Sequence, residues 1–99
     1  MRVISKKTLT SFWNTSQYQD AEEPLKAWYA EAKAASWRTP ADVKDKYGSA
    51  SILKNSRAVF NIAGNKYRLV VNIHYNTGIV YIRFIDTHPE YDKIHAETI

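Results

Sequence analysis

The chain has 99 residues, 44% of them hydrophobic, with a formal net charge of +4 and a sequence pI of about 9.4. This length supports one compact core and is too short for two, so we treat residues 1–99 as a single domain. The absence of cysteine excludes a disulfide framework and a thiolate metal site. The sequence has no apolar run typical of a signal peptide or a membrane span, so we expect a cytoplasmic protein with no membrane contact.

The first half of the chain predicts a short strand followed by helices. Val3 and Ile4 indicate an edge strand, and Ser5 suits the N-cap of a first helix. Acids and a proline at 22–24 suit the first turn of a second helix, and Thr39 with Pro40 restarts a short helical turn. The two longer helices are expected to form a hairpin with one broad apolar and aromatic face, made of Leu9, Phe12, Trp13, Leu25, Trp28, Tyr29, Ala32 and Ala35.

The second half of the chain alternates between apolar and polar residues, as strands do. After an expected loop at 48–51, we predict strands at 58–62, 66–75 and 79–85, separated by turns around Gly64 and Gly78. These strands form an antiparallel meander, and a short helix follows at 87–92. The predicted fold class is α+β, with the helical hairpin packed on one face of a small antiparallel sheet.

Basic residues concentrate in this second half. Between Asp45 and Asp86 there is no acid but six bases, namely Lys46, Lys54, Arg57, Lys66, Arg68 and Arg83. Alternation turns one set of side chains toward the helices: Tyr67, Leu69, Val71, Ile73 and Tyr75 in one strand, and Val80, Ile82 and Phe84 in the next. Arg68 and Arg83 then share the opposite face with Tyr81, Asn72 and Ile85, provided that the hairpin has no bulge.

Two guanidiniums on one face can clamp a phosphodiester, and Tyr81 can stack on a base. The alternative is that the arginines are ordinary solvated residues. The segment that follows the last strand runs from Thr87 to Asp92, and its Thr87 and Glu90 have the spacing of a helix capping box. His88 and Tyr91 can transfer protons or stack, although His88 also fits an exposed cap position. The histidine spacing and the few glycines give no metal site and no nucleotide loop, so we expect no metal and no cofactor.

Residues 59–70, 81–83 and 87–92 together resemble the HigB toxins, which belong to the RelE-like mRNA interferases of bacterial toxin–antitoxin systems. The resemblance implies a RelE/ParE-like fold and a metal-independent endoribonuclease. Such a toxin cleaves mRNA, commonly in the ribosomal A site, and thereby inhibits translation. It also implies neutralisation by a helix-turn-helix antitoxin of the HigA type. The RNA 2′-hydroxyl serves as nucleophile, so the protein needs a base, an acid and cations.

The same resemblance assigns roles to residues of this chain. Arg68 and Arg83 correspond to phosphate-stabilising arginines, His88 to a general acid or base, and Tyr91 to a residue that orients the nucleotide or assists proton transfer. Asp92 is expected to hold local structure. RelE itself uses lysines for proton transfer, so the division between acid and base stays open. The expected RNA contacts are Lys54, Arg57, Lys66, Asn72 and Tyr81.

Two other functions fit the same residues. A ParE-like toxin inhibits DNA gyrase and cleaves no RNA, and a basic helix and sheet architecture serves both branches. A non-catalytic RNA-binding module would use the arginines and tyrosines only to hold and stack a strand.

Overall fold

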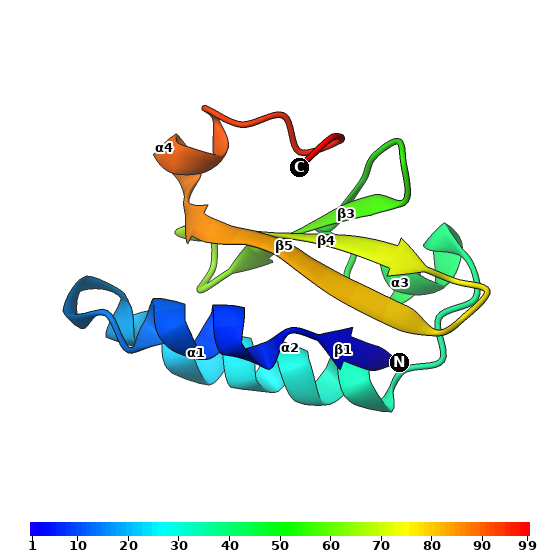
Figure 1. Ribbon diagram of the computed structural model, residues 1–99, viewed down its shortest axis with the longest axis horizontal. Helices are drawn as coiled ribbons and strands as arrows, with labels where there is room; N and C mark the ends of the chain where they lie inside the picture. The colour runs from blue at the N-terminus through cyan, green and yellow to red at the C-terminus, as the bar shows by residue number, and fades with distance from the viewer.

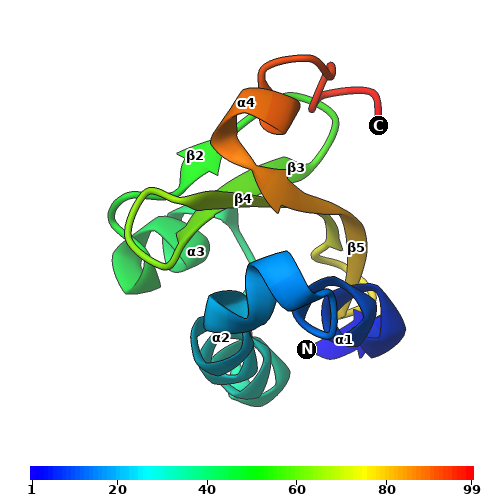
Figure 2. The same ribbon diagram turned by 90° about the vertical axis from the view of Figure 1, so that its left-hand side faces the viewer.

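The computed structural model describes residues 1–99 as an α+β fold, which confirms the predicted class. Its elements in chain order are β1 (Arg2–Ile4), α1 (Lys6–Trp13), the 3₁₀ helix η1 (Ser16–Ala21), α2 (Glu22–Ala34), α3 (Pro40–Lys46), β2 (Ser51–Ile52), β3 (Arg57–Ile62), β4 (Tyr67–His74), β5 (Ile79–Thr87) and α4 (His88–Tyr91). Figure 1 shows α1 and α2 below the sheet, and α4 with the last residues of the chain above it. Figure 2 shows the same layers from the side, with α3 also on the α1 and α2 side.

The sheet has five strands in the order β1-β5-β4-β3-β2. Strands β3, β4 and β5 form the predicted antiparallel meander, but β1 pairs with β5 in parallel, so the expectation of a purely antiparallel sheet is wrong. The expected loop at 48–51 is also corrected, because Ser51 and Ile52 pair with β3 as the edge strand β2. The intervening turn places Asn55 and Ser56 at φ 59° and 60°. The sequence lacks the Asn-Gly pair that usually announces such a turn.

The main core lies between the sheet and the helices and contains 20 buried residues. Helix α1 buries Leu9, Phe12 and Trp13, and α2 buries Leu25, Trp28 and Ala32, at the helical spacing the sequence predicted. The predicted members Tyr29 and Ala35 are only partly buried and pack at the edge of this core. Strand β4 contributes its alternate residues Tyr67, Leu69, Val71 and Ile73. Trp28 packs edge-on against Phe60 of β3, with ring centroids 5.4 Å apart.

A β-bulge in β5 changes which side chains face the helices. Val70 pairs with Phe84 and Val71 with Ile82, so Arg83 is the extra residue between them. Alternation therefore reverses after Ile82. Ile85 enters the main core and Phe84 packs on the opposite face, which is the reverse of their predicted positions.

Asp20 joins the helical layer to the sheet. Its carboxylate accepts hydrogen bonds from the ammonium of Lys66 and from the hydroxyl of Tyr67. The hydrogen bond from Lys66, followed by that from Tyr67, holds the pKa of Asp20 below its usual value. No sequence pattern predicts this link, because Asp20 lies in a polar stretch 46 residues before Lys66.

We expect this link to make stability depend on pH. A carboxyl whose pKa is lower in the folded state stabilises the fold above its unfolded pKa, near 4, and loses that contribution as the pH falls through the folded value. Asp20→Asn should therefore lower the free energy of unfolding at pH 7 and reduce its further loss at pH 3. Urea denaturation at both pH values tests this. Asp45→Asn is the matched control, since Asp45 forms no hydrogen bond or ion pair through its side chain. Equal acid sensitivity of the two variants would contradict the prediction.

Candidate active site on the outer face of the sheet

The candidate site lies on the outer face, by which we mean the face of the sheet opposite α1 and α2. Cross-strand pairing places three rows of residues there. One row joins Arg57, Asn72 and Tyr81, and the next joins Val59, Val70 and Phe84. The third row consists of Asn61, Arg68 and Asp86, at the end of the sheet from which α4 departs.

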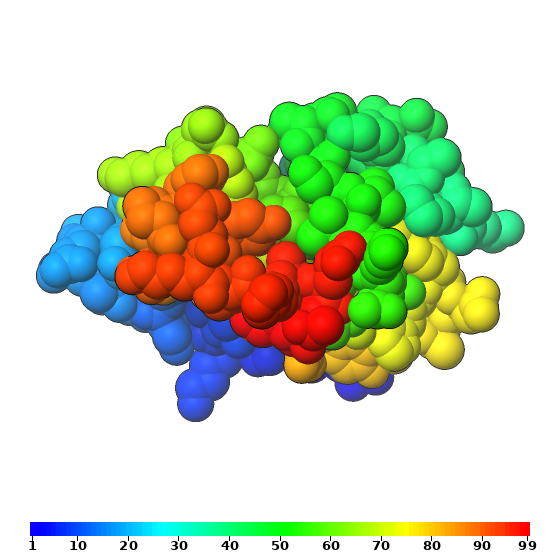
Figure 3. Space-filling model, turned by 90° about the horizontal axis from the view of Figure 1, so that it is seen from above, coloured from blue at the N-terminus to red at the C-terminus, as the bar shows by residue number.

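The middle row is apolar and is covered by the end of the chain. Val59, Val70 and Ala96 form a small buried cluster with the partly buried residues Leu53, Phe84, Tyr91, Ile94 and Ile99. We call residues 93–99 the strap. Figure 3 shows α4 and the strap, in orange and red, lying across the molecule as seen from above. The outer face is therefore not an open platform.

Arg68 lies in the third row and is half-buried. Its Nη1 donates to the carbonyl oxygens of Asn65, at 3.2 Å, and Tyr67, at 3.4 Å, so the guanidinium lies at the β3–β4 turn. Asp86 is its cross-strand neighbour, yet Arg68 has no carboxylate within ion-pair distance. A partly buried and unpaired guanidinium is suited to an anionic ligand.

His88 lies at the same end of the sheet as Arg68. It is the first residue of α4, whose N-cap is Thr87, and its main-chain N–H donates to the carbonyl oxygen of Lys66 at 3.2 Å. That bond ties the start of α4 to the β3–β4 turn on which Arg68 lies. The imidazole Nδ1 is 3.5 Å from a carboxylate oxygen of Asp92, and the side chain remains 45% exposed. The histidine is thus oriented on one side and accessible on the other.

Arg83 points to a different partner. Its Nε donates to the main-chain oxygen of Ile99 at 3.2 Å, and Arg57 donates to the same oxygen from Nε at 3.1 Å and Nη2 at 2.6 Å. The row containing Val70 lies between Arg68 and the Arg57 row. Arg68 and Arg83 share the outer face as predicted, despite the bulge, but their guanidiniums do not meet on one partner.

The sequence of the chain matches one family of known proteins. A family model described as HigB_toxin, a RelE-like toxic component of a toxin-antitoxin system, matches residues 21–94. The chain belongs to this family. The match spans α2 to α4 and includes Arg68, Arg83 and His88. The resemblance seen in the sequence is thereby confirmed, and a toxin of this kind implies an antitoxin partner. No curated protein matches the chain.

The other residues expected to act in this HigB-type toxin take varied positions. Lys66 is paired with Asp20, and the main-chain N–H of Lys54 donates to Glu97 of the strap at 3.2 Å. Tyr81 contacts His74 edge-on, with ring centroids 4.9 Å apart. The Oδ1 atom of Asn72 is buried and has no hydrogen-bond partner.

Sequence reasoning missed the residues that close the outer face. Asn55 donates from its side chain to the main-chain oxygen of Glu97 at 2.9 Å, and Ile99 accepts from both arginines. The one available signal was the apolar set Ile94, Ala96 and Ile99 in an otherwise polar tail. Apolar residues in such a tail indicate that it packs on the domain.

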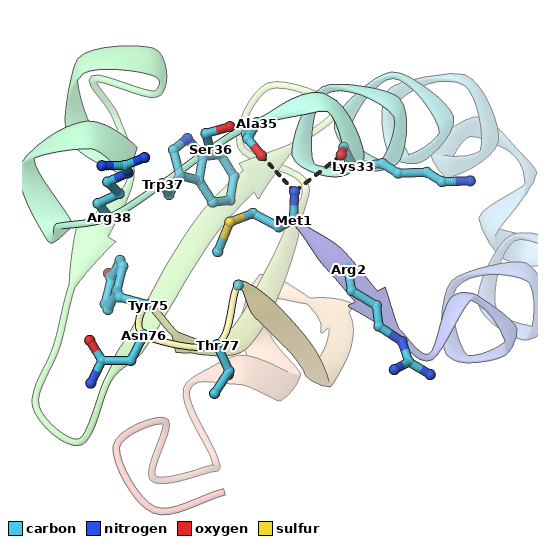
Figure 4. Close-up of a pocket in the computed structure, with 11 residues that line it drawn as sticks. Met1, Arg2, Lys33, Ala35, Ser36, Trp37, Arg38, Tyr75, Asn76 and Thr77 are labelled. Atoms are coloured by element: carbon cyan, nitrogen blue, oxygen red, sulfur yellow. Dashed lines mark hydrogen bonds between the residues drawn. The ribbon is translucent and has the colours of Figure 1, made fainter.

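The largest hollow of this HigB-family chain, about 710 Å³, lies away from these residues. Figure 4 shows it between β1, the end of α2 and the β4–β5 turn, with Trp37 and Tyr75 in its lining. Arg38 points away from Arg2 and Lys33 there, so the three cations do not converge on one ligand. No three histidine, aspartate or glutamate side chains cluster as metal ligands would. None of the helices combines the length and apolar character needed to cross a membrane.

Tyr91 allows a test of how α4 is held. Its ring packs on the small cluster with Val59 and Val70, while its hydroxyl makes no hydrogen bond within the chain. We expect Tyr91→Phe to change the free energy of unfolding by less than about 0.5 kcal/mol, and Tyr91→Ala to lower it by about 1–2 kcal/mol through lost burial. Chemical denaturation measures both. A cost as large for Tyr91→Phe as for Tyr91→Ala would show that the hydroxyl, not the ring, holds α4.

Proposed function

We propose that the protein is an mRNA interferase, a metal-independent endoribonuclease that cleaves mRNA and so inhibits translation. One observation carries the proposal: the main-chain hydrogen bond from His88 to Lys66 joins the residue that carries an accessible imidazole to the turn on which the unpaired Arg68 lies. A proton-transfer group and a phosphate-binding group then occupy one end of the outer face. Membership of a RelE-like toxin family supports the same assignment.

The proposed reaction uses the nucleophile that RNA carries. The 2′-hydroxyl loses its proton to a base and attacks the adjacent phosphorus, while the 5′-oxygen of the next nucleotide leaves and takes a proton from an acid. The products are a 2′,3′-cyclic phosphate and a 5′-hydroxyl. His88 supplies one of these proton transfers, and Arg68 binds the phosphate oxygens as their charge increases. Tyr91, on the same helix, orients the nucleotide or assists the other transfer.

The proposal extends to the partners and the location. The substrate is mRNA held in the ribosomal A site, the partner that silences the toxin is a helix-turn-helix antitoxin of the HigA type, and the protein acts in the cytoplasm. The net charge of +4 supports an anionic partner such as RNA. Lys54, Arg57, Lys66, Asn72 and Tyr81 contact the RNA around the reacting nucleotide, with Arg83 assisting at the phosphates.

We expect the two central residues to be required for cleavage. Arg68→Ala should lower the cleavage rate roughly 10²- to 10³-fold by removing charge stabilisation, and His88→Ala roughly 10²- to 10⁴-fold by removing a proton transfer. Primer extension on cellular mRNA after brief induction maps the breaks. Arg38→Ala and His95→Ala are matched controls, since neither side chain makes a hydrogen bond or ion pair within the chain.

The outcomes separate the competing functions. Wild-type breaks that persist in Arg68→Ala or His88→Ala would refute the role of that residue, once circular dichroism has shown that the variant is folded. Growth arrest with intact RNA and a DNA-damage response would favour a gyrase-inhibiting toxin. RNA binding without cleavage, unchanged in His88→Ala, would favour a non-catalytic module.

A further inference from the structure

The strap is held on the outer face by hydrogen bonds that involve side chains and by apolar packing, and not by sheet pairing. Only Ala96 among its residues is buried, at 8% exposure. Its N–H groups donate within the strap and to α4, as in the bonds from Thr98 and Ile99 to the His95 carbonyl oxygen, and none pairs with a strand of the sheet. Glu97 adds two hydrogen bonds to the β2–β3 turn, one from Lys54 and one from Asn55. Such a segment can open locally without unfolding the domain.

Arg57 and Arg83 converge on one oxygen of the strap. Both donate to the single main-chain oxygen of Ile99, and neither has an aspartate or glutamate oxygen within 4.0 Å. A phosphodiester offers two oxygens and a full negative charge, and its hydrogen bonds to guanidinium are charge-assisted.

The residue beside Arg57 leaves a further polar group unused. Asn72 is the cross-strand partner of Arg57, and its Oδ1 is buried without a hydrogen bond. A buried acceptor without a donor is unfavourable, and native structures contain few of them. A ligand that contacts Arg57 therefore lies beside Asn72, whose side-chain oxygen has no hydrogen-bond donor.

We infer that Arg57 and Arg83 form a second phosphate subsite for single-stranded RNA, which the strap occupies in the resting protein and which RNA opens by displacing it. The inference rests on the proposed function and extends it. Arg57 faces Asn72, four residues along β4 from Arg68, a separation of about 13 Å at roughly 3.3 Å per residue. This separation exceeds the spacing of adjacent phosphates and fits a phosphate about two nucleotides along the same strand. The apparent association constant for RNA is then that of the open protein multiplied by the fraction of time that the strap is open.

A variant that lifts the strap tests the inference. Ala96→Glu places a charge at the buried contact, and Thr98→Glu places the same charge at an exposed position of the same segment. The probe is a fluorescent single-stranded RNA made entirely of 2′-O-methyl nucleotides, which cannot be cleaved through the 2′-oxygen. We expect Ala96→Glu to bind it about 5- to 10-fold more tightly than Thr98→Glu. Adding Arg57→Ala should abolish that gain and reduce the slope of log affinity against log salt by about 0.7.

A second measurement uses the wild-type chain and does not depend on these variants. Saturating RNA probe should speed amide hydrogen exchange at Thr98 and Ile99, because so short a segment does not keep its internal bonds to His95 once it has left the sheet. Strap amides that stay equally protected in the RNA complex would overturn the inference, as would equal affinity of Ala96→Glu and Thr98→Glu. Because the probe cannot be cleaved, strap release without breaks in cellular mRNA would refute the nuclease and leave the phosphate subsite standing.

Discussion

The arrangement of the outer face depends on the β-bulge at Arg83. An unbulged β5 would turn Phe84 toward α1 and α2 and Ile85 toward the outer face. With one extra residue in β5, Arg83 and Phe84 both lie on the outer face and Ile85 enters the main core. Asp86 then pairs with Arg68. The bulge also sets the side of the sheet from which α4 leaves, and so places His88 next to the β3–β4 turn. Bulges re-aim side chains, and this one changes the face on which the residues from Phe84 onward lie, up to the start of α4.

The strap follows from the composition of that face. Val59, Val70 and Phe84 leave an apolar strip on the face of the sheet that α1 and α2 do not cover. Burying such a strip is favourable, and the strap provides the cover with Ala96, Ile94 and Ile99. The same cover lies over Arg57 and Arg83, both of which donate to the main-chain oxygen of Ile99. Part of a face that carries arginines is thus covered by the chain itself.

Sequence patterns predicted the elements whose residues face a core with regular spacing. Leu9, Phe12 and Trp13 revealed α1, and the alternation from Tyr67 to Ile73 revealed β4 and its inward face. Strand β2 was missed because two residues carry no periodicity, and the parallel pairing of β1 was missed because it joins Arg2 to Ile79. In the candidate site, the placement of Arg68 and Arg83 on one face was correct, although the alternation behind it failed after Ile82 at a bulge that no residue type announced.

The sequence by itself determined the fold class, the family, the basic segment and the residues able to do phosphate chemistry, because these depend on residue type and local spacing. The tertiary structure alone decided which of those residues lie together. It separated Arg68 from Arg83, paired Lys66 with Asp20, joined His88 to the Arg68 turn, and laid the strap over Arg57. The physical reason is that hydrogen bonds and burial between residues 16 to 46 positions apart depend on how the strands register, and a single bulge changes that register without changing any local pattern.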